Sequence, residues 1–273
     1  MTLNEAISLL EKAGVDSPDY DARELFRAFG ALNTPLITQS TFSNAPALLE
    51  ALERRAKREP LQYILGNVGF YREEYRVTSD CLIPRSDTEI LVDYAVKNIP
   101  SGERFADLCS GSGCIGISTL ANTKETSCIS VDISQNALNL TLENAKNNGV
   151  IDRINTVCID LLNCDHLPCG KLFAVLSNPP YVREEVYENL SAEIFHEPKI
   201  AFVAQKAGLE FYEKLTPMAL ECLQDRGFIA YEIGYDQANE ITRIAHANGC
   251  SCEIIKDYSG NDRVAVLKKS TGI

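Results

Sequence analysis

The feature that most constrains this chain is an alternation of strand-like and helix-like segments that begins near residue 87. Such an alternation predicts a parallel sheet with helices on both faces. The last two strands are separated by residues 257–261 alone, too few for a crossover helix, so the last strand must run antiparallel. We therefore expect an α/β fold with a seven-stranded, mostly parallel Rossmann-like sheet. The expected strands are residues 104–109, 127–132, 154–159, 172–177, 227–233, 250–256 and 264–268.

The first 60 residues carry a different pattern, which is helical throughout. Ser17 and Pro18 form a helix start, and apolar residues then recur at one face as far as Phe29. A second helix is expected over residues 45–58, ended by Pro60. Aromatic and β-branched residues over 67–78 suggest a short hairpin. We thus expect an N-terminal helical domain at 1–66, a β-hairpin linker at 67–86 and an α/β domain at 87–273.

Composition narrows the classes of function. The chain is 45% hydrophobic and has a formal net charge of −12, which counts against a protein that holds a nucleic-acid backbone unaided. No run approaches the about 18 apolar residues of a membrane span. The ten cysteines and three histidines lack metal-ligand spacing. We expect a cytoplasmic monomer with no metal, no membrane contact and no direct requirement for nucleic acid.

A glycine-rich loop follows the first expected strand of the sheet. Gly111 and Gly113 allow a tight turn and close approach of a ligand to the backbone, and the next helix offers free N–H groups. Asp132, at the end of the second strand, is placed to accept the ribose hydroxyls of a nucleoside. Asp160 ends the third strand and could accept from an adenine amino group, or simply cap a helix. The loop with Gly116 also matches a dinucleotide fingerprint, so a nicotinamide cofactor stays open here.

The tetrapeptide Asn178-Pro179-Pro180-Tyr181 directly follows the fourth expected strand. Ligands of open parallel sheets bind beyond the carboxyl ends of the strands, so this turn should lie beside the glycine loop. The Asn178 side-chain oxygen and the Pro179 carbonyl could hold both N–H bonds of a planar amine or amide. That grip would aim the nitrogen lone pair at a methyl donor and stabilise the developing positive charge. Tyr181 could pack on the flat face of the group. A rigid turn with a local Asn178 cap is the plain alternative.

These residues resemble the amino-methyltransferases that carry a [DNS]-P-P-[YFW] motif. More narrowly, the chain resembles the release-factor glutamine methyltransferase family, the HemK-like proteins, over essentially its whole length. The narrower match adds four stretches to the tetrapeptide: residues 59–66, 82–89, 197–198, and 257–258 together with 261–264. The resemblance implies transfer of a methyl group from S-adenosylmethionine to the glutamine of the Gly-Gly-Gln loop of peptide-chain release factors. It also implies that the helical domain contacts the release factor.

The resemblance carries site roles onto positions of this sequence. The acceptor clamp is assigned to Asn178, Pro179, Pro180 and Tyr181. The donor site is assigned to Asp107, Cys109, Ser110, Gly111, Ser112, Gly113, Asp132, Ile133, Asp160, Leu161 and Asn178. Two positions depart from the family pattern. Cys109 stands where glycine is frequent, and Leu161 stands where some members have an aromatic residue that could stack on adenine.

Several alternatives remain at this point. The tetrapeptide is shared with enzymes that methylate exocyclic amines of nucleic-acid bases, although the charge of −12 disfavours them. A nicotinamide-linked dehydrogenase is a second alternative, but it would leave the tetrapeptide without a role. A third is a catalytically idle binding module, which would bind the donor and transfer nothing. For residues 84–89, a wall over the donor site and a capped helix start with Glu89 in its first turn are both compatible with the sequence.

Overall fold

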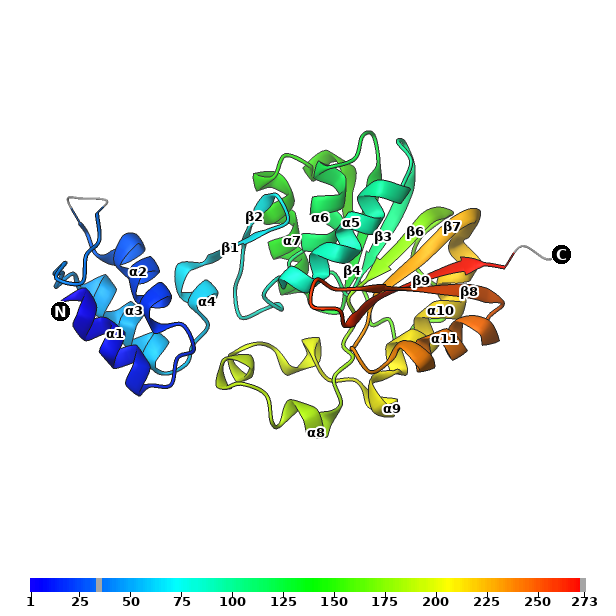
Figure 1. Ribbon diagram of the computed structural model, residues 1–273. Coiled ribbons are helices and arrows are strands. Elements are labelled where there is room, and N and C mark those ends of the chain that lie inside the picture. Colours follow the sequence, from blue (N-terminus) through cyan, green and yellow to red (C-terminus); the bar gives the residue numbers. More distant parts are fainter. Residues whose placement is uncertain (33–35, 271–273) are drawn as a thin grey trace. The chain divides into compact units, whose positions relative to one another are not determined.

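The computed structural model describes residues 1–32 and 36–270 (Figure 1). Over these residues, contacts divide the chain into two compact units, each with a hydrophobic core of its own. The helical unit comprises residues 1–67 and the distant segment Ser191–His196. The sheet unit comprises residues 68–190 and those from 197 onward. Within the described ranges, every helix is too short or too polar to cross a membrane.

The helical unit is formed by α1 (Leu3–Lys12), α2 (Pro18–Phe29), α3 (Pro46–Ala56) and α4 (Leu61–Leu65). Thr2 caps α1 reciprocally: its hydroxyl oxygen accepts from Glu5 N (3.2 Å), and the Glu5 carboxylate accepts from Thr2 N (2.7 Å). Prolines open α2 and α3, where a missing N–H leaves no hydrogen bond unmade. Buried side chains of these helices, with Phe26 among them, form the core. The two helices expected here are therefore present.

Ion pairs hold the segment Ser191–His196 in the helical unit. Arg58 donates to both carboxylate oxygens of Glu193, at 2.7 and 2.6 Å, and Arg55 donates to one of them at 3.0 Å. Arg55 also donates to Asp21 at 2.7 Å. Burial by itself would raise the pKa of Glu193, but the hydrogen bonds from Arg58 and Arg55 outweigh it and lower that pKa to about 2. A segment far along the chain is thereby held by two arginines of α3 and its C-terminal end.

The sheet of the sheet unit has the strand order β5-β4-β3-β6-β7-β9-β8, which makes seven strands among the described residues. The first five pair in parallel, and β9 pairs antiparallel with both β7 and β8. The expected mostly parallel sheet with an antiparallel last strand is confirmed. The strands are β3 (Arg104–Leu108), β4 (Ser127–Asp132), β5 (Ile154–Cys158), β6 (Leu172–Ser177), β7 (Leu223–Glu232), β8 (Cys250–Lys256) and β9 (Asp262–Lys269).

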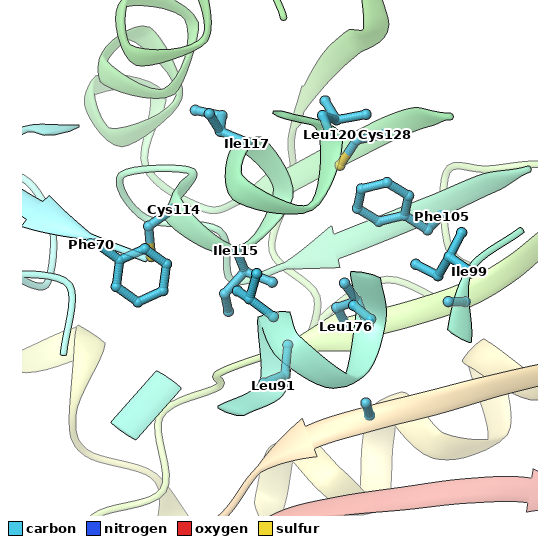
Figure 2. Packing of buried hydrophobic residues seen from close by; sticks show 14 of the residues in the cluster. Phe70, Leu91, Ile99, Phe105, Cys114, Ile115, Ile117, Leu120, Cys128 and Leu176 are labelled. Carbon is cyan, nitrogen blue, oxygen red and sulfur yellow. The ribbon is translucent and has the colours of Figure 1, made fainter. Parts of the chain in front are cut away.

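Helices cover both faces of this sheet, in three layers (Figure 1). One face packs on α5 (Glu89–Asn98), α6 (Cys114–Ala121) and α7 (Gln135–Asn147), and Figure 2 shows Leu91 of α5 and Ile115 of α6 near Leu176 of the sheet. The other face packs on α10 (Glu210–Cys222) and α11 (Ala238–Ala247). Adjacent residues of β3 enter opposite cores, as the period of a strand buried on both faces requires.

Shorter elements occur in both units, and η3 (Ala192–His196) belongs to the helical unit. Strands β1 (Asn67–Phe70) and β2 (Glu73–Arg76) form a separate two-stranded sheet. The short helices are η1 (Ser86–Thr88), η2 (Ile151–Arg153), α8 (Glu184–Tyr187), η3 (Ala192–His196), η4 (Lys199–Ala201) and α9 (Gln205–Gly208). The parallel register places Leu108 opposite Val131 and Ser177, so β3, β4 and β6 end at one edge. The loops that leave these strands therefore meet there.

Candidate functional site

The glycine loop leaves β3 through a left-handed backbone. Gly111 and Gly113 have φ of 55° and 80°, and Gly113 precedes α6. A Cβ at Gly113 would lie 2.7 Å from Cγ2 of Thr141, so a side chain is excluded there. Cys109 also has a positive φ, 58°. This cysteine therefore keeps the conformation that glycine prefers, at a backbone cost of about 1–2 kcal/mol.

Asp132 at the end of β4 holds the loop in place. Its two carboxylate oxygens accept from Gly111 N and Ser134 N, each at 2.9 Å. Burial raises the pKa of Asp132, while these backbone hydrogen bonds oppose the rise. Each oxygen keeps a second lone pair, so the carboxylate can still accept two hydroxyl hydrogens from a ligand.

Asp160 and Leu161 follow β5. The carboxylate of Asp160 accepts from Asn163 Nδ2 at 2.7 Å and from Leu162 N at 2.9 Å, so it stabilises its own turn. The hydrogen bond from Asn163 is the main reason that the pKa of Asp160 is lowered. Leu161 is buried and supplies an apolar wall in place of an aromatic one. The helix cap considered for Asp160 is wrong, because residues 159–171 form turns and no helix begins there; the carboxylate closes a turn instead.

Asp107 lies under the loop, within β3, and is completely buried. One of its oxygens accepts from Gly116 N at 2.9 Å, and the other has no hydrogen-bond partner among the described residues. Burial raises its pKa to about 7. Because its side chain accepts from the first turn of α6, Asp107 stabilises the position of the glycine loop that precedes this helix.

The tetrapeptide that begins at Asn178 follows β6 at the same edge. Asn178 Nδ2 lies 3.4 Å from the Thr88 hydroxyl oxygen, to which it donates. The Tyr181 hydroxyl donates to the Glu232 carboxylate at 3.1 Å, and burial raises the pKa of Tyr181. Gln237 Nε2 donates to the Tyr181 carbonyl at 3.3 Å. The tetrapeptide is therefore held at both ends by buried side chains of other elements.

A cavity of about 420 Å³ opens at this edge, within the size range of small-molecule sites. Asp107, Gly113, Pro179 and Tyr181 lie outside its wall, and Tyr181 borders a neighbouring cavity of about 440 Å³. The wall includes the predicted residues Cys109, Ser110, Gly111, Ser112, Asp132, Ile133, Asp160, Leu161, Asn178 and Pro180. The structure thus brings the glycine loop and Asn178 to one cavity.

The cavity suits S-adenosylmethionine chemically. Asp132 offers acceptors for ribose hydroxyls, while Ile133, Leu161 and Phe211 provide apolar surface for a flat base. Ser110 Oγ is buried and lacks a hydrogen-bond partner among residues 1–32 and 36–270, which leaves it available to a polar ligand atom. Buried polar atoms without partners are rare unless a ligand or water satisfies them. The donor set therefore fits an adenosine attached to a charged amino acid.

Residues 82–89 form one wall of the cavity and also start α5. Glu197 is buried and accepts from Ile83 N at 2.9 Å as well as from Arg85. At the other end, the Thr88 hydroxyl donates to Glu232 at 2.6 Å. Because Pro84 and Arg85 line the cavity while Glu89 opens α5, the wall and the helix start considered above are both present.

Sequence reasoning missed three residues at this site: Thr88, Phe211 and Glu232. Glu232 ends β7, and its position at the carboxyl end of a parallel strand was a usable signal. Thr88 lay within the stretch 82–89 that carried the resemblance, but without a role of its own, and nothing local marked Phe211. Within the described residues no group of three or more His, Cys, Asp or Glu side chains could hold a metal, and no disulfide joins any of the ten cysteines there.

Comparisons with known proteins agree with this geometry. The family model described as the PrmC N-terminal domain matches residues 2–66, and the methyltransferase small domain matches residues 86–205. The chain is 35% identical over 280 residues to a release factor glutamine methyltransferase of Fusobacterium nucleatum, covering 98% of this chain and 78% of the relative. It is 35% identical over 270 residues to another of the same name from Caulobacter vibrioides, covering 96% and 93%. A solved structure of Methanocaldococcus jannaschii Trm5 with adenosine shares the fold, at a TM-score of 0.53 and 17% identity, covering 76% of this chain and 55% of that one.

Proposed function

The chain belongs to the family of release factor glutamine methyltransferases, and from that premise we propose its reaction. It transfers a methyl group from S-adenosylmethionine to the side-chain amide nitrogen of the glutamine in the Gly-Gly-Gln motif of peptide-chain release factors. The observation that carries this proposal is the shared cavity, whose wall contains both Asn178 and the glycine loop with Asp132. A donor held by the loop would therefore share its cavity with Asn178.

The donor is held by groups that the fold has already positioned. Asp132 accepts the ribose hydroxyls through the lone pairs that Gly111 N and Ser134 N leave free. Ser110 Oγ and the N–H groups at the start of α6 face the polar end of the donor. When bound, S-adenosylmethionine supplies an electrophilic methyl group on a positively charged sulfur.

The acceptor amide is a weak nucleophile because its nitrogen lone pair is delocalised. The Asn178 side-chain oxygen and the Pro179 carbonyl accept hydrogen bonds from its two N–H groups. This orientation turns the nitrogen lone pair toward the methyl group. The same two oxygens stabilise the positive charge that grows on nitrogen. Alignment and electrostatics therefore supply most of the acceleration, and the proton leaves after transfer. Tyr181, whose hydroxyl is engaged by Glu232, stiffens the end of this clamp.

We assign residues 1–66 to recognition of the release factor and the sheet unit to catalysis. This division is supported by the separate hydrophobic core of the helical unit. The net charge of −12 supports a protein acceptor over duplex DNA.

The test compares the wild type with Asn178→Ala, using labelled donor and purified release factor. We expect Asn178→Ala to lower kcat by about 10²–10³-fold, as for other positioned polar groups, while calorimetry shows that donor binding persists. Asn98→Ala is the matched control, because Asn98 is exposed on α5 and bonds only the Tyr94 carbonyl among the described residues. Near-normal transfer by Asn178→Ala would exclude the clamp. Label on duplex DNA and none on the release factor would exclude the acceptor.

A further inference from the structure

A chain of hydrogen bonds runs from the end of β7 to the acceptor clamp. The Thr88 hydroxyl donates to one carboxylate oxygen of Glu232 at 2.6 Å, and Asn178 Nδ2 donates to the same hydroxyl oxygen at 3.4 Å. The Tyr181 hydroxyl donates to the other Glu232 oxygen at 3.1 Å. Thr88 and Glu232 are each 2% exposed, so water cannot readily replace either partner.

The donor and acceptor properties of these groups fix the direction of each hydrogen bond in this series. An ionised carboxylate only accepts hydrogen bonds, and a hydroxyl has a single hydrogen to donate. Once the Thr88 hydrogen is committed to Glu232, the Thr88 oxygen can only accept from Asn178. The NH2 end of the Asn178 amide must then face Thr88, and its oxygen must face the cavity. The two ends of an amide have nearly the same shape, so the partner's chemistry decides between them.

We infer that Thr88 and Glu232 are positioning residues that set the polarity of the clamp, by forcing the Asn178 oxygen toward the acceptor. This inference rests on the proposed function, since the oxygen matters only if a planar N–H donor enters the cavity. A flipped Asn178 would present NH2 to the acceptor's own NH2, and transfer would stop. Neither residue needs to touch the acceptor for this effect.

The donor-to-acceptor direction of these hydrogen bonds depends on the charge of Glu232. Burial raises the pKa of Glu232 and the charge of Asp87 adds to the rise, whereas the Thr88 hydrogen bond, the charge of Arg263 and the Tyr181 hydroxyl oppose it. A protonated Glu232 can donate to Thr88, which frees the threonine hydrogen to point at Asn178. Protonation of Glu232 should therefore lower transfer.

A purely structural role for Thr88 predicts a different order of variants. Valine keeps the shape and branching of threonine, while serine keeps the hydroxyl and loses a methyl group. If Thr88 only fills space, Thr88→Val should be tolerated better than Thr88→Ser. If it relays polarity, Thr88→Ser should be active and Thr88→Val impaired.

The experiment measures kcat/KM for the release factor, donor affinity by calorimetry and thermal stability. We expect Thr88→Val to lose about tenfold or more in kcat/KM, because the Asn178 NH2 loses its hydrogen-bond acceptor in the productive orientation. Thr88→Ser should stay within about threefold of the wild type, and donor affinity should be unchanged in both. Thr119→Val is the matched control, since Thr119 is buried and its hydroxyl has no partner among the described residues.

Glu232→Gln provides the second arm. The glutamine amide has one NH2 group, so either Thr88 or Tyr181 faces a hydrogen-bond donor where it now faces an acceptor. Because this variant lacks the carboxyl group, the fall of kcat at low pH should disappear. Equal activity of Thr88→Val and wild type, or equal impairment of the valine and serine variants, would overturn the inference. Absence of transfer by the wild type would instead refute the proposed function, so the two failures are distinguishable.

Discussion

Gly208, at the end of α9, offers the sharpest test of how the clamp is supported. Its φ is +85°, and an added Cβ would lie 2.1 Å from the Tyr181 carbonyl oxygen and 2.7 Å from Gln237 Nε2. The side-chain amide of Gln237 could move, but the carbonyl is backbone that directly follows Pro180. Gly208→Ala must therefore displace the tetrapeptide or the α9 turn.

Two costs add in this variant. An alanine in the left-handed region costs about 1–2 kcal/mol. Overpacking against a fixed atom adds about 1–3 kcal/mol. We expect the free energy of unfolding to fall by about 2–5 kcal/mol, and kcat to fall as Asn178 is moved with its loop.

Gly260→Ala separates the two costs. Gly260 has φ of +88°, and nothing lies within 4 Å of an added Cβ. In this variant the free energy of unfolding should fall by the backbone cost alone, about 1–2 kcal/mol, and activity should be unchanged. Urea unfolding and steady-state transfer assays on both variants give the comparison. If Gly208→Ala is no less stable than Gly260→Ala and methylates normally, the contact with Tyr181 is not a constraint on the site.

Two further predictions concern the aspartates around the glycine loop. Asp132→Ala should weaken donor binding about tenfold or more in calorimetry, because charged acceptors for the ribose and for Gly111 N are lost together; a dissociation constant within twofold of the wild type would contradict this. Asp107 has a pKa raised by burial to about 7 from an unfolded value of 3.8, so its stabilising contribution is complete below about pH 4 and is lost as the pH rises through about 7. Asp107→Asn should remove that decline from urea unfolding measured across this pH window, and an unchanged pH profile would show that Asp107 is not its source.

The sequence by itself determined the sheet and the edge at which the site lies. Residues 127–132 and 172–177 were predicted as strands and are strands, because a run of apolar and β-branched residues buried on both faces has few other stable conformations. The glycines after β3 marked a turn that other residues cannot easily form. Because parallel strands end at one edge, the meeting of Asp132 and Asn178 followed from topology alone.

Tertiary structure decided what surrounds those residues. Thr88 reaches Glu232 across 144 positions of the chain and Asn178 across 90, and no local pattern encodes such pairs. The direction of the Tyr181 hydroxyl toward Glu232 and the capture of Glu193 by Arg58 have the same origin. Local propensity acts over a few residues, whereas a buried polar group takes whichever partner the packed chain brings near, since leaving it unpaired costs more than any local preference.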